Sequence, residues 1–322
     1  MTCTRTAALL AALCLVEPPT AAAQGLPTYT PINPTTTSRS ALYFQPYERP
    51  APAWRATAQL DWASLIEATR PGKPESFLLD AEVLRLELTL VRDYGPANFV
   101  LLSASVNGAV DGYMDGFYDW YHDLTGLRVP AREQRPRNEF AYQGTFADGE
   151  TRSWDKAPVF LGDVKLGLGV RHSPALQTLV FVTLPTTTAG RGYGRGVASA
   201  NGIVTGRGEW SGRLVYEGSL GFGWTPRHGE LEEFQKTTFW SASSGLRLRF
   251  WGQQSMFFTG FWQTAGYRDT NLELFDRAEL TADMGFIVRT SPGAPELVLA
   301  LTEDLKPSGP AVDATFRVGL RW

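Results

Sequence analysis

Asp and His residues gather in one stretch of the sequence, residues 111–127, which reads DGYMDGFYDWYHDLTGL. Carboxylates and an imidazole three or four residues apart share one face of a helix, and such groups can bind a cation. The residues with this spacing are Asp115, Asp119, His122 and Asp123. A solvated acidic face with a histidine near the helix end is the better interpretation, because no second cluster supplies further ligands. We therefore expect neither a metal site nor a cofactor.

Nucleophilic catalysis would need a histidine beside a serine or a carboxylate. The other two histidines are His172, at a short turn, and His228, which precedes Glu230 and two further glutamates. An ordinary loop explains the surroundings of His228 better than an active site does. We expect no catalytic residue.

A glycine-rich run, GRGYGRG at residues 190–196, is too irregular for a dinucleotide-binding fingerprint and does not connect a strand to a helix. Its arginines, Arg191 and Arg195, could face lipopolysaccharide phosphates. A plain loop is the simpler interpretation.

The stretch 111–127 also has the apolar spacing of an amphipathic helix, with Gly126 as a C-cap. Its apolar stripe contains Phe117 and Trp120, and a second stripe contains Asp111. The residues of interest in this helix are Asp111, Asp115, Phe117, Asp119, Trp120, His122 and Asp123. We expect a short helix in a long connection.

The first residues have the order of a secretory signal peptide, with cleavage expected after Ala23. Cys3 and Cys14 both lie in this segment, so a mature chain would lack disulfides and thiol chemistry. The expected division is residues 1–23 as signal peptide, 24–53 as a proline-rich segment and 54–322 as the folded domain.

The formal net charge of −3 is too close to zero to indicate a nucleic-acid partner. After the signal peptide there is no apolar run of the length that a membrane-spanning helix needs. Strands are therefore the remaining way for this chain to cross a membrane.

Strictly alternating segments run through the rest of the chain, with apolar residues on one face and polar or small residues on the other. A soluble β-sandwich would give a similar pattern. The expected strands are 54–62, 77–91, 98–107, 159–171, 176–184, 200–209, 213–225, 237–250, 255–265, 277–290, 296–304 and 312–322.

Three further features favour a membrane barrel. The final strand alternates and ends on an aromatic residue, which resembles the assembly signal of outer-membrane barrels; its apolar face contains Phe316, Val318, Leu320 and Trp322. Tryptophans lie near strand ends, where a barrel needs interfacial girdles. Short and long connections alternate along the chain, as periplasmic turns and extracellular loops do in such barrels. These connections join about twelve antiparallel strands and place both chain ends on the periplasmic side.

The polar face of these strands would line the lumen of an up-and-down barrel. The charged residues expected there are Arg55, Arg85, Glu87, Lys165, Arg171, Glu217, Arg247, Arg249, Glu279, Asp283, Arg289, Arg317 and Arg321. Cross-strand ion pairs and a polar channel with a basic bias both explain this set. A barrel of about twelve strands lies between filled and open barrels, so its size does not decide between them.

Residues 24–53 are rich in proline and threonine and precede the first convincing strand. A loose periplasmic tail is typical of a chain end with this composition. The alternative is a plug that enters the lumen.

The loop also carries a resemblance. The run D-G-x-x-D-G-F-x-D-x-x-H-D-L is followed by a basic stretch and by Gly162-Asp163. The basic stretch contains Arg132, Arg135, Pro136, Arg137 and Asn138. Together they resemble bacterial domain-of-unknown-function family 3187, over roughly residues 26–322. The resemblance implies a secreted outer-membrane protein and brings no assigned activity.

The sequence thus predicts an all-β transmembrane barrel in the bacterial outer membrane. Its expected partners are outer-membrane lipid and lipopolysaccharide, the barrel assembly machinery during biogenesis and a small solute, with no nucleic acid. The first hypothesis is a passive channel whose mouth is partly occluded by the helix of residues 111–127. The alternatives are a lipid-modifying enzyme with a pocket near His122 or His228, and a structural barrel whose lumen is filled by side chains and the N-terminal residues.

Overall fold

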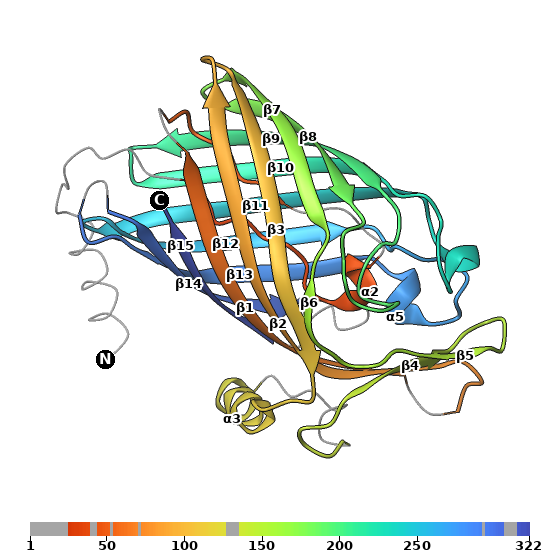
Figure 1. Cartoon of the computed structure of the whole chain (residues 1–322). Helices are drawn as coiled ribbons and strands as arrows, with labels where there is room; N and C mark the ends of the chain where they lie inside the picture. Colours follow the sequence, from red (N-terminus) through yellow and green to blue (C-terminus); the bar gives the residue numbers. More distant parts are fainter. Residues whose placement is uncertain are drawn as a thin grey trace.

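A computed structural model describes residues 25–38, 44–51, 54–69, 72–126, 135–291, 294–305 and 314–322 (Figure 1). The expected signal peptide of residues 1–23 and Arg132 of the basic stretch lie outside the described residues.

The described strands form a closed antiparallel barrel of twelve strands, as the sequence predicted. These strands are β1 Arg55–Ala68, β2 Ser76–Tyr94, β3 Asn98–Val110, β7 Val164–Ser173, β8 Leu176–Leu184, β9 Ser199–Trp210, β10 Leu214–Trp224, β11 Thr238–Trp251, β12 Gln254–Gln263, β13 Glu279–Val288, β14 Glu296–Asp304 and β15 Ala314–Arg321. Each strand pairs with its neighbours, and pairing of β1 with β15 closes the barrel. The barrel is a transmembrane one, with an apolar surface on its outside.

The two faces of the strands show why this sequence suits a membrane. On β2, Leu86 and Leu88 point outward and are 52% and 44% exposed, whereas Arg85 and Glu87 between them are 4% and 6% exposed. In a soluble sandwich the leucines would be buried and the charges would meet water. Here the apolar residues face lipid and the polar residues fill the lumen.

The two ends of the barrel differ. Short turns join the strands at one end, the turn end, where β1 begins and β15 finishes, and long connections lie at the other, the loop end (Figure 1). β1 extends to Ala68, six residues beyond its expected end at residue 62. Beyond the wall, the extension of β2 pairs with β4 (Ala141–Thr145), which pairs with β5 (Thr151–Ser153). β4 and β5 lie where the sequence indicated only a loop, whereas the expected strand 159–171 is divided between β6 (Ala157–Leu161) and β7.

Four short helical elements occur in the described residues: α2 (Pro34–Thr37), α3 (Asp115–Thr125), η1 (Glu232–Phe234) and α5 (Glu273–Asp276). Among the described residues, no helix is long and apolar enough to span a membrane. The helix α3 begins and ends close to the predicted bounds and is capped by Gly126, whose φ is 74°. α3 confirms the predicted amphipathic helix.

The position of α3 differs from the prediction, which placed it in the barrel mouth. It packs against Phe316 on the outward face of β15, and the Tyr118 hydroxyl donates to the backbone oxygen of Trp62 on β1. Figure 1 shows α3 outside the strands at the loop end. Contacts between aromatic side chains of the helix and Phe316 on the outer wall explain this placement.

The segment that does enter the lumen is the N-terminal one, which the structure describes over residues 25–38 and 44–51. Leu26, Tyr29 and Phe44 in it are 3%, 2% and 3% exposed, and α2 lies among the barrel strands (Figure 1). These described residues lie inside the barrel, and their role as a plug stays a prediction.

Candidate functional site

A group of buried ion pairs, the central ionic group, lies in the middle of the lumen. The Arg317 guanidinium bridges two carboxylates, with Nε 2.7 Å from Asp61 Oδ1 and an Nη1 atom 2.7 Å from Asp283 Oδ2. Arg85 also pairs with Asp61, at 2.7 Å. Buried charges are tolerated only when they are paired and hydrogen-bonded. Alternation along β1, β2, β13 and β15 brings these four side chains together, because each lies on the inward face.

Arginines of the barrel wall bind the backbone of the N-terminal segment. Arg85 donates to the carbonyl oxygens of Thr30 and Pro31, both at 2.7 Å. Near the turn end, Arg321 donates to the carbonyl oxygen of Leu26 at 3.0 Å. A segment rich in proline has carbonyl groups that no helix or sheet satisfies, so the wall supplies the donors.

Carboxylates on the wall bind the amide and hydroxyl donors of the segment. Glu217 accepts the Leu26 N–H at 3.2 Å and the Tyr47 N–H at 3.3 Å, and it also pairs with Arg207. Glu279 accepts the Thr36 hydroxyl at 3.3 Å. Polar contacts therefore reach the segment from several sides of the lumen.

Aromatic packing fixes the middle of the segment. The ring of Tyr29 stacks on Phe261 of β12 with centroids 4.2 Å apart. The centroid of the Phe44 ring lies 4.7 Å from that of Phe261. The Arg317 guanidinium lies over the Tyr29 ring, 5.5 Å from the ring centroid. The contact links the aromatic group to the central ionic group.

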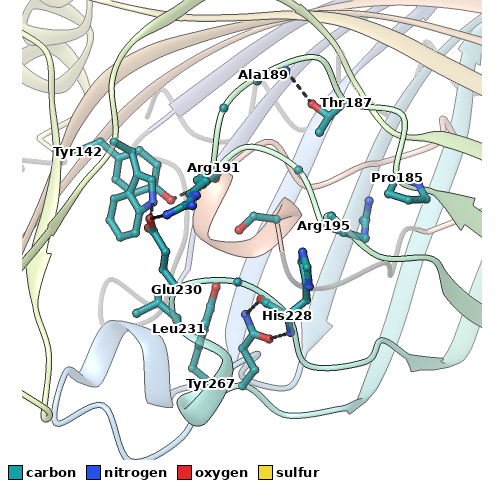
Figure 2. Close-up of a pocket in the computed structure, with 18 of the residues that line it drawn as sticks. Tyr142, Pro185, Thr187, Ala189, Arg191, Arg195, His228, Glu230, Leu231 and Tyr267 are labelled. Carbon is teal, nitrogen blue, oxygen red and sulfur yellow. Dashed lines mark hydrogen bonds and ion pairs between the residues drawn. The ribbon is translucent and has the colours of Figure 1, made fainter. Parts of the chain in front are cut away.

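On the loop-end side of this segment lies a cavity of about 800 Å³, the loop-end cavity. Its floor includes Ser38, directly after α2. Figure 2 shows Tyr142 on one side and Pro185 and Arg195 on the other, with His228 between the loops below them. The aromatic side is a packed wall, since Tyr142 and Trp154 have centroids 4.3 Å apart.

Charges in the loop-end cavity are paired. Arg191 lies 2.7 Å from Glu230 Oε1, and the Trp154 indole donates to Glu230 Oε2 at 3.0 Å (Figure 2). The buried Arg195 pairs with Asp163 at 3.1 Å. Burial lowers the pKa of Arg195, and the carboxylate of Asp163 opposes that effect. The same kind of burial raises the pKa of Tyr142 well above its ordinary value, so its hydroxyl stays protonated.

On the opposite side of the segment lies a second cavity of about 440 Å³, the turn-end cavity, lined in part by Leu26, Tyr47, Trp54, Arg321 and Trp322. Between the two, a narrow pocket of about 70 Å³ follows the wall of β2, β3 and β7, and it shares Arg195 with the loop-end cavity. The N-terminal segment separates the two larger cavities.

A family model described as a protein of unknown function (DUF3187) matches residues 14–182. This chain belongs to the DUF3187 family. No curated protein matches its sequence.

Among solved structures, this DUF3187 barrel is similar to an outer-membrane channel from Pseudomonas putida F1, with 13% identity, a TM-score of 0.56 and coverage of 85% of this chain and 96% of that one. A FadL homologue from Pseudomonas aeruginosa matches with 10% identity, a TM-score of 0.39 and coverage of 94% and 99%. At this identity the first likeness shows a shared barrel fold.

The charged residues that the sequence indicated for the lumen have inward-facing positions in this DUF3187 barrel. The buried ones are Arg85, Glu87, Lys165, Arg171, Glu217, Arg247, Arg249, Glu279, Asp283 and Arg317, and the half-buried ones are Arg55, Arg289 and Arg321. Sequence reasoning missed their partners Asp61, Asp93 and Glu296. The same alternation could have found Asp61, which shares a face with Arg55.

The loop-helix residues do not converge on one point. Asp111 pairs with Lys156 at 2.9 Å, Asp119 pairs with Arg137 at 2.6 Å, and Asp115 accepts the Asn138 N–H at 2.6 Å. His122 is buried beside the Tyr121 ring. Within the described part of the chain, no group of three or more His, Cys, Asp and Glu side chains is placed to hold a metal ion.

His228 lies in the loop-end cavity rather than beside a nucleophile. Its backbone exchanges hydrogen bonds with the side chain of Gln235, and its ring lies over Gly196. Gly196 has a φ of 68°, and an added Cβ there would come within 2.5 Å of the imidazole. The glycine therefore lets the two loops approach each other.

The residues of the expected assembly signal divide between two places. Phe316 lies under α3, whereas Val318 and Leu320 face lipid and Trp322 lines the turn-end cavity. The backbone of Trp322 pairs with Ala56 of β1 at the barrel seam. Their role in assembly stays a prediction.

Proposed function

We propose that this DUF3187 protein is an outer-membrane transport barrel for small solutes, closed in the structure by its own N-terminal segment. The observation that carries the proposal is the pair of cavities, about 800 and 440 Å³, which open toward opposite ends of one lumen and are separated by that segment. In this orientation the loop end is extracellular and the turn end periplasmic.

The contacts of the segment support a removable gate. It contributes no strand to the barrel, and its isolated bridge joins its own residues Tyr29 and Phe44. Withdrawal of the segment would therefore leave the hydrogen-bonded wall intact.

The wall arginines would also keep partners after withdrawal. Arg317 would retain Asp61 and Asp283, and Arg321 would retain Glu296. An open lumen would contain paired charges instead of isolated ones, which keeps the cost of opening low.

The loop-end cavity indicates the kind of solute. An aromatic wall of Tyr142, Trp154, Tyr267 and Phe275 faces a side that carries Arg195 and His228. Cavities of this size that combine apolar walls with a few polar groups bind small organic molecules. We infer a small organic solute with both an apolar and a polar part.

Single-channel conductance tests the proposal. The mature chain and a variant without residues 25–51 would each be refolded and placed in a planar bilayer. We expect rare openings with the mature chain and steady conductance with the variant. Equal conductance of both proteins would show that the segment is not a gate.

A structural barrel with a permanently filled lumen is the second candidate, favoured by the burial of Leu26, Tyr29 and Phe44 of the segment. It predicts a variant that folds but stays silent, with no uptake of sugars or amino acids into vesicles. Folding would be verified by the heat-dependent shift of the barrel on an electrophoresis gel.

A further inference from the structure

The helix α3 exposes an apolar stripe. Tyr113, Phe117, Trp120 and Leu124 are 77%, 37%, 56% and 69% exposed. Their spacing of three and four residues places Phe117, Trp120 and Leu124 on one side of the helix, with Tyr113 one turn before it. A soluble loop would gain nothing from such a stripe, so it needs an apolar neighbour.

The helix is fixed to the outer wall along the side next to this stripe, and Phe117 lies where the two sides meet. Phe117, Tyr118 and Tyr121 surround the Phe316 ring, with centroids 5.2, 5.8 and 6.1 Å away. The Tyr121 hydroxyl donates to Glu303 Oε1 on β14 at 2.6 Å. The orientation of the stripe is thus set by contacts with two strands.

Glu82 anchors the start of the loop from the outward face of β2. Its Oε1 atom accepts the N–H groups of Tyr113 at 2.7 Å and Met114 at 2.5 Å, and its Oε2 atom accepts the Trp62 indole at 2.7 Å. Glu82 is 1% exposed. A carboxylate on the lipid-facing side of a barrel is tolerable only when covered and hydrogen-bonded, so the loop and this residue require each other.

The stripe continues the lipid-facing surface of the barrel. Toward the turn end from Phe316, the outward residues Val318 and Leu320 are 47% and 45% exposed, and Leu60 pairs with Val318 on the neighbouring strand. The polar side of the helix is occupied separately by the pair of Asp119 with Arg137. Apolar helix face and apolar wall therefore adjoin at the loop end.

We propose that α3 is a membrane-interface helix, which inserts Phe117, Trp120 and Leu124 among the lipids of the outer leaflet beside the barrel. The proposal rests on the outer-membrane placement in the proposed function, but not on transport. Amphipathic helices bind membranes by laying an apolar stripe into the boundary between head groups and acyl chains. Trp and Tyr are the side chains that favour this boundary.

Single-cysteine labelling tests the position of the stripe. The mature chain beginning at Gln24 has no cysteine, so Trp120→Cys and Leu124→Cys each introduce one labelling site. Asp123→Cys is the matched control on the polar side of the same helix, and Val318→Cys is the control for a residue in lipid. Each variant would be labelled with a nitrobenzoxadiazole fluorophore and refolded into phosphatidylcholine vesicles with and without doxyl-labelled lipid.

We expect doxyl lipid to quench the probes at positions 120 and 124 within about twofold of the probe at 318, while aqueous iodide quenches the probe at 123 at least about threefold more than these. Preferential iodide quenching at 120 and 124 would overturn the proposal. Quenching that depends instead on the protein-to-lipid ratio would also overturn it, because a second copy would then cover the stripe. Failure of doxyl lipid to quench at 318 would reject the membrane barrel itself, which separates the two proposals.

Discussion

Two segments outside the barrel strands attach to opposite faces of the same piece of wall. The N-terminal segment binds inside, at Arg85 and Arg317, and α3 binds outside, at Trp62 and at Phe316, the residue next to Arg317. The inner attachment joins arginines to backbone carbonyls, and the outer one joins aromatic rings. Successive side chains of a strand point to opposite faces, so neighbouring residues of one strand can bind different segments, one inside the barrel and one outside.

Deletion of each segment in turn should distinguish their effects on conductance most clearly. Loss of residues 25–51 should raise mean conductance by at least about a hundredfold, because several hydrogen bonds from charged donors, each about 1.5–3 kcal/mol, hold the segment. Replacement of residues 115–125 by a short Gly-Ser linker should leave conductance unchanged. An increase in the second variant would show that α3 also closes the lumen.

A single change inside the lumen should have an intermediate effect. Arg85→Gln removes the charged donors to Thr30 and Pro31, while Arg317 still pairs with Asp61. We expect the open probability in single-channel records to rise about tenfold or more. Ser103→Ala is the control, since the Ser103 hydroxyl donates to Glu87, a wall residue. A similar rise in both variants would point to a general loosening of the lumen.

A single change outside the barrel should be smaller and should not reach the lumen. Tyr118→Phe removes the hydrogen bond to Trp62, which is worth about 1 kcal/mol. Hydrogen exchange of the α3 amides should accelerate about fivefold, and conductance should stay the same. Tyr113→Phe, on the exposed stripe, should change neither quantity. If Tyr118→Phe opened the channel, the two attachments would be coupled through the wall.

The smallest effect concerns the β4–β5 hairpin, which belongs to neither attachment. The hydrogen bonds of Arg152 to Asp148 lower the pKa of that carboxyl to about 2. A lowered pKa in the folded state contributes stability that is present above the unfolded pKa of about 3.9 and is lost as pH falls through about 2.

This surface pair is worth only about 0.5 kcal/mol. Hydrogen exchange of residues 141–153 should therefore be slower in the wild type than in Asp148→Asn at pH 5, and the difference should decrease as pH falls through about 2. A difference of the same size at pH 5 and at pH 2 would contradict the role of this carboxylate. Conductance and the α3 amides should not respond to the substitution.

Sequence reasoning found the strands because each face of the wall meets a different medium. β8 and β14 were predicted with the bounds that the structure shows. The end of β1 was missed because both faces of the strand are buried there. Leu65 on the inward face and Ser64 and Ile66 on the outward face are each at most 7% exposed. Where both faces are buried, alternation disappears.

The burial of the charged strand residues follows from the same alternation, but the placement of the two segments does not. The arginines bind main-chain carbonyls of the N-terminal segment, and such acceptors have no sequence signature. An amphipathic stripe such as that of α3 suits a lumen wall and a lipid surface equally. The choice between them depends on Phe316 and Trp62, far away in the sequence.

The composition of the N-terminal segment also bears on what could move it. Residues 25–51 contain two arginines and one glutamate, a net charge of one. Carrying one elementary charge across a membrane changes the energy by about 2.3 kcal/mol per 100 mV, so an electrical potential has little hold on this segment. Ser38 of this segment lines the loop-end cavity, so a solute in the cavity could contact the segment directly. If the segment is the gate that we propose, we expect occupancy of the loop-end cavity to move it more readily than voltage does.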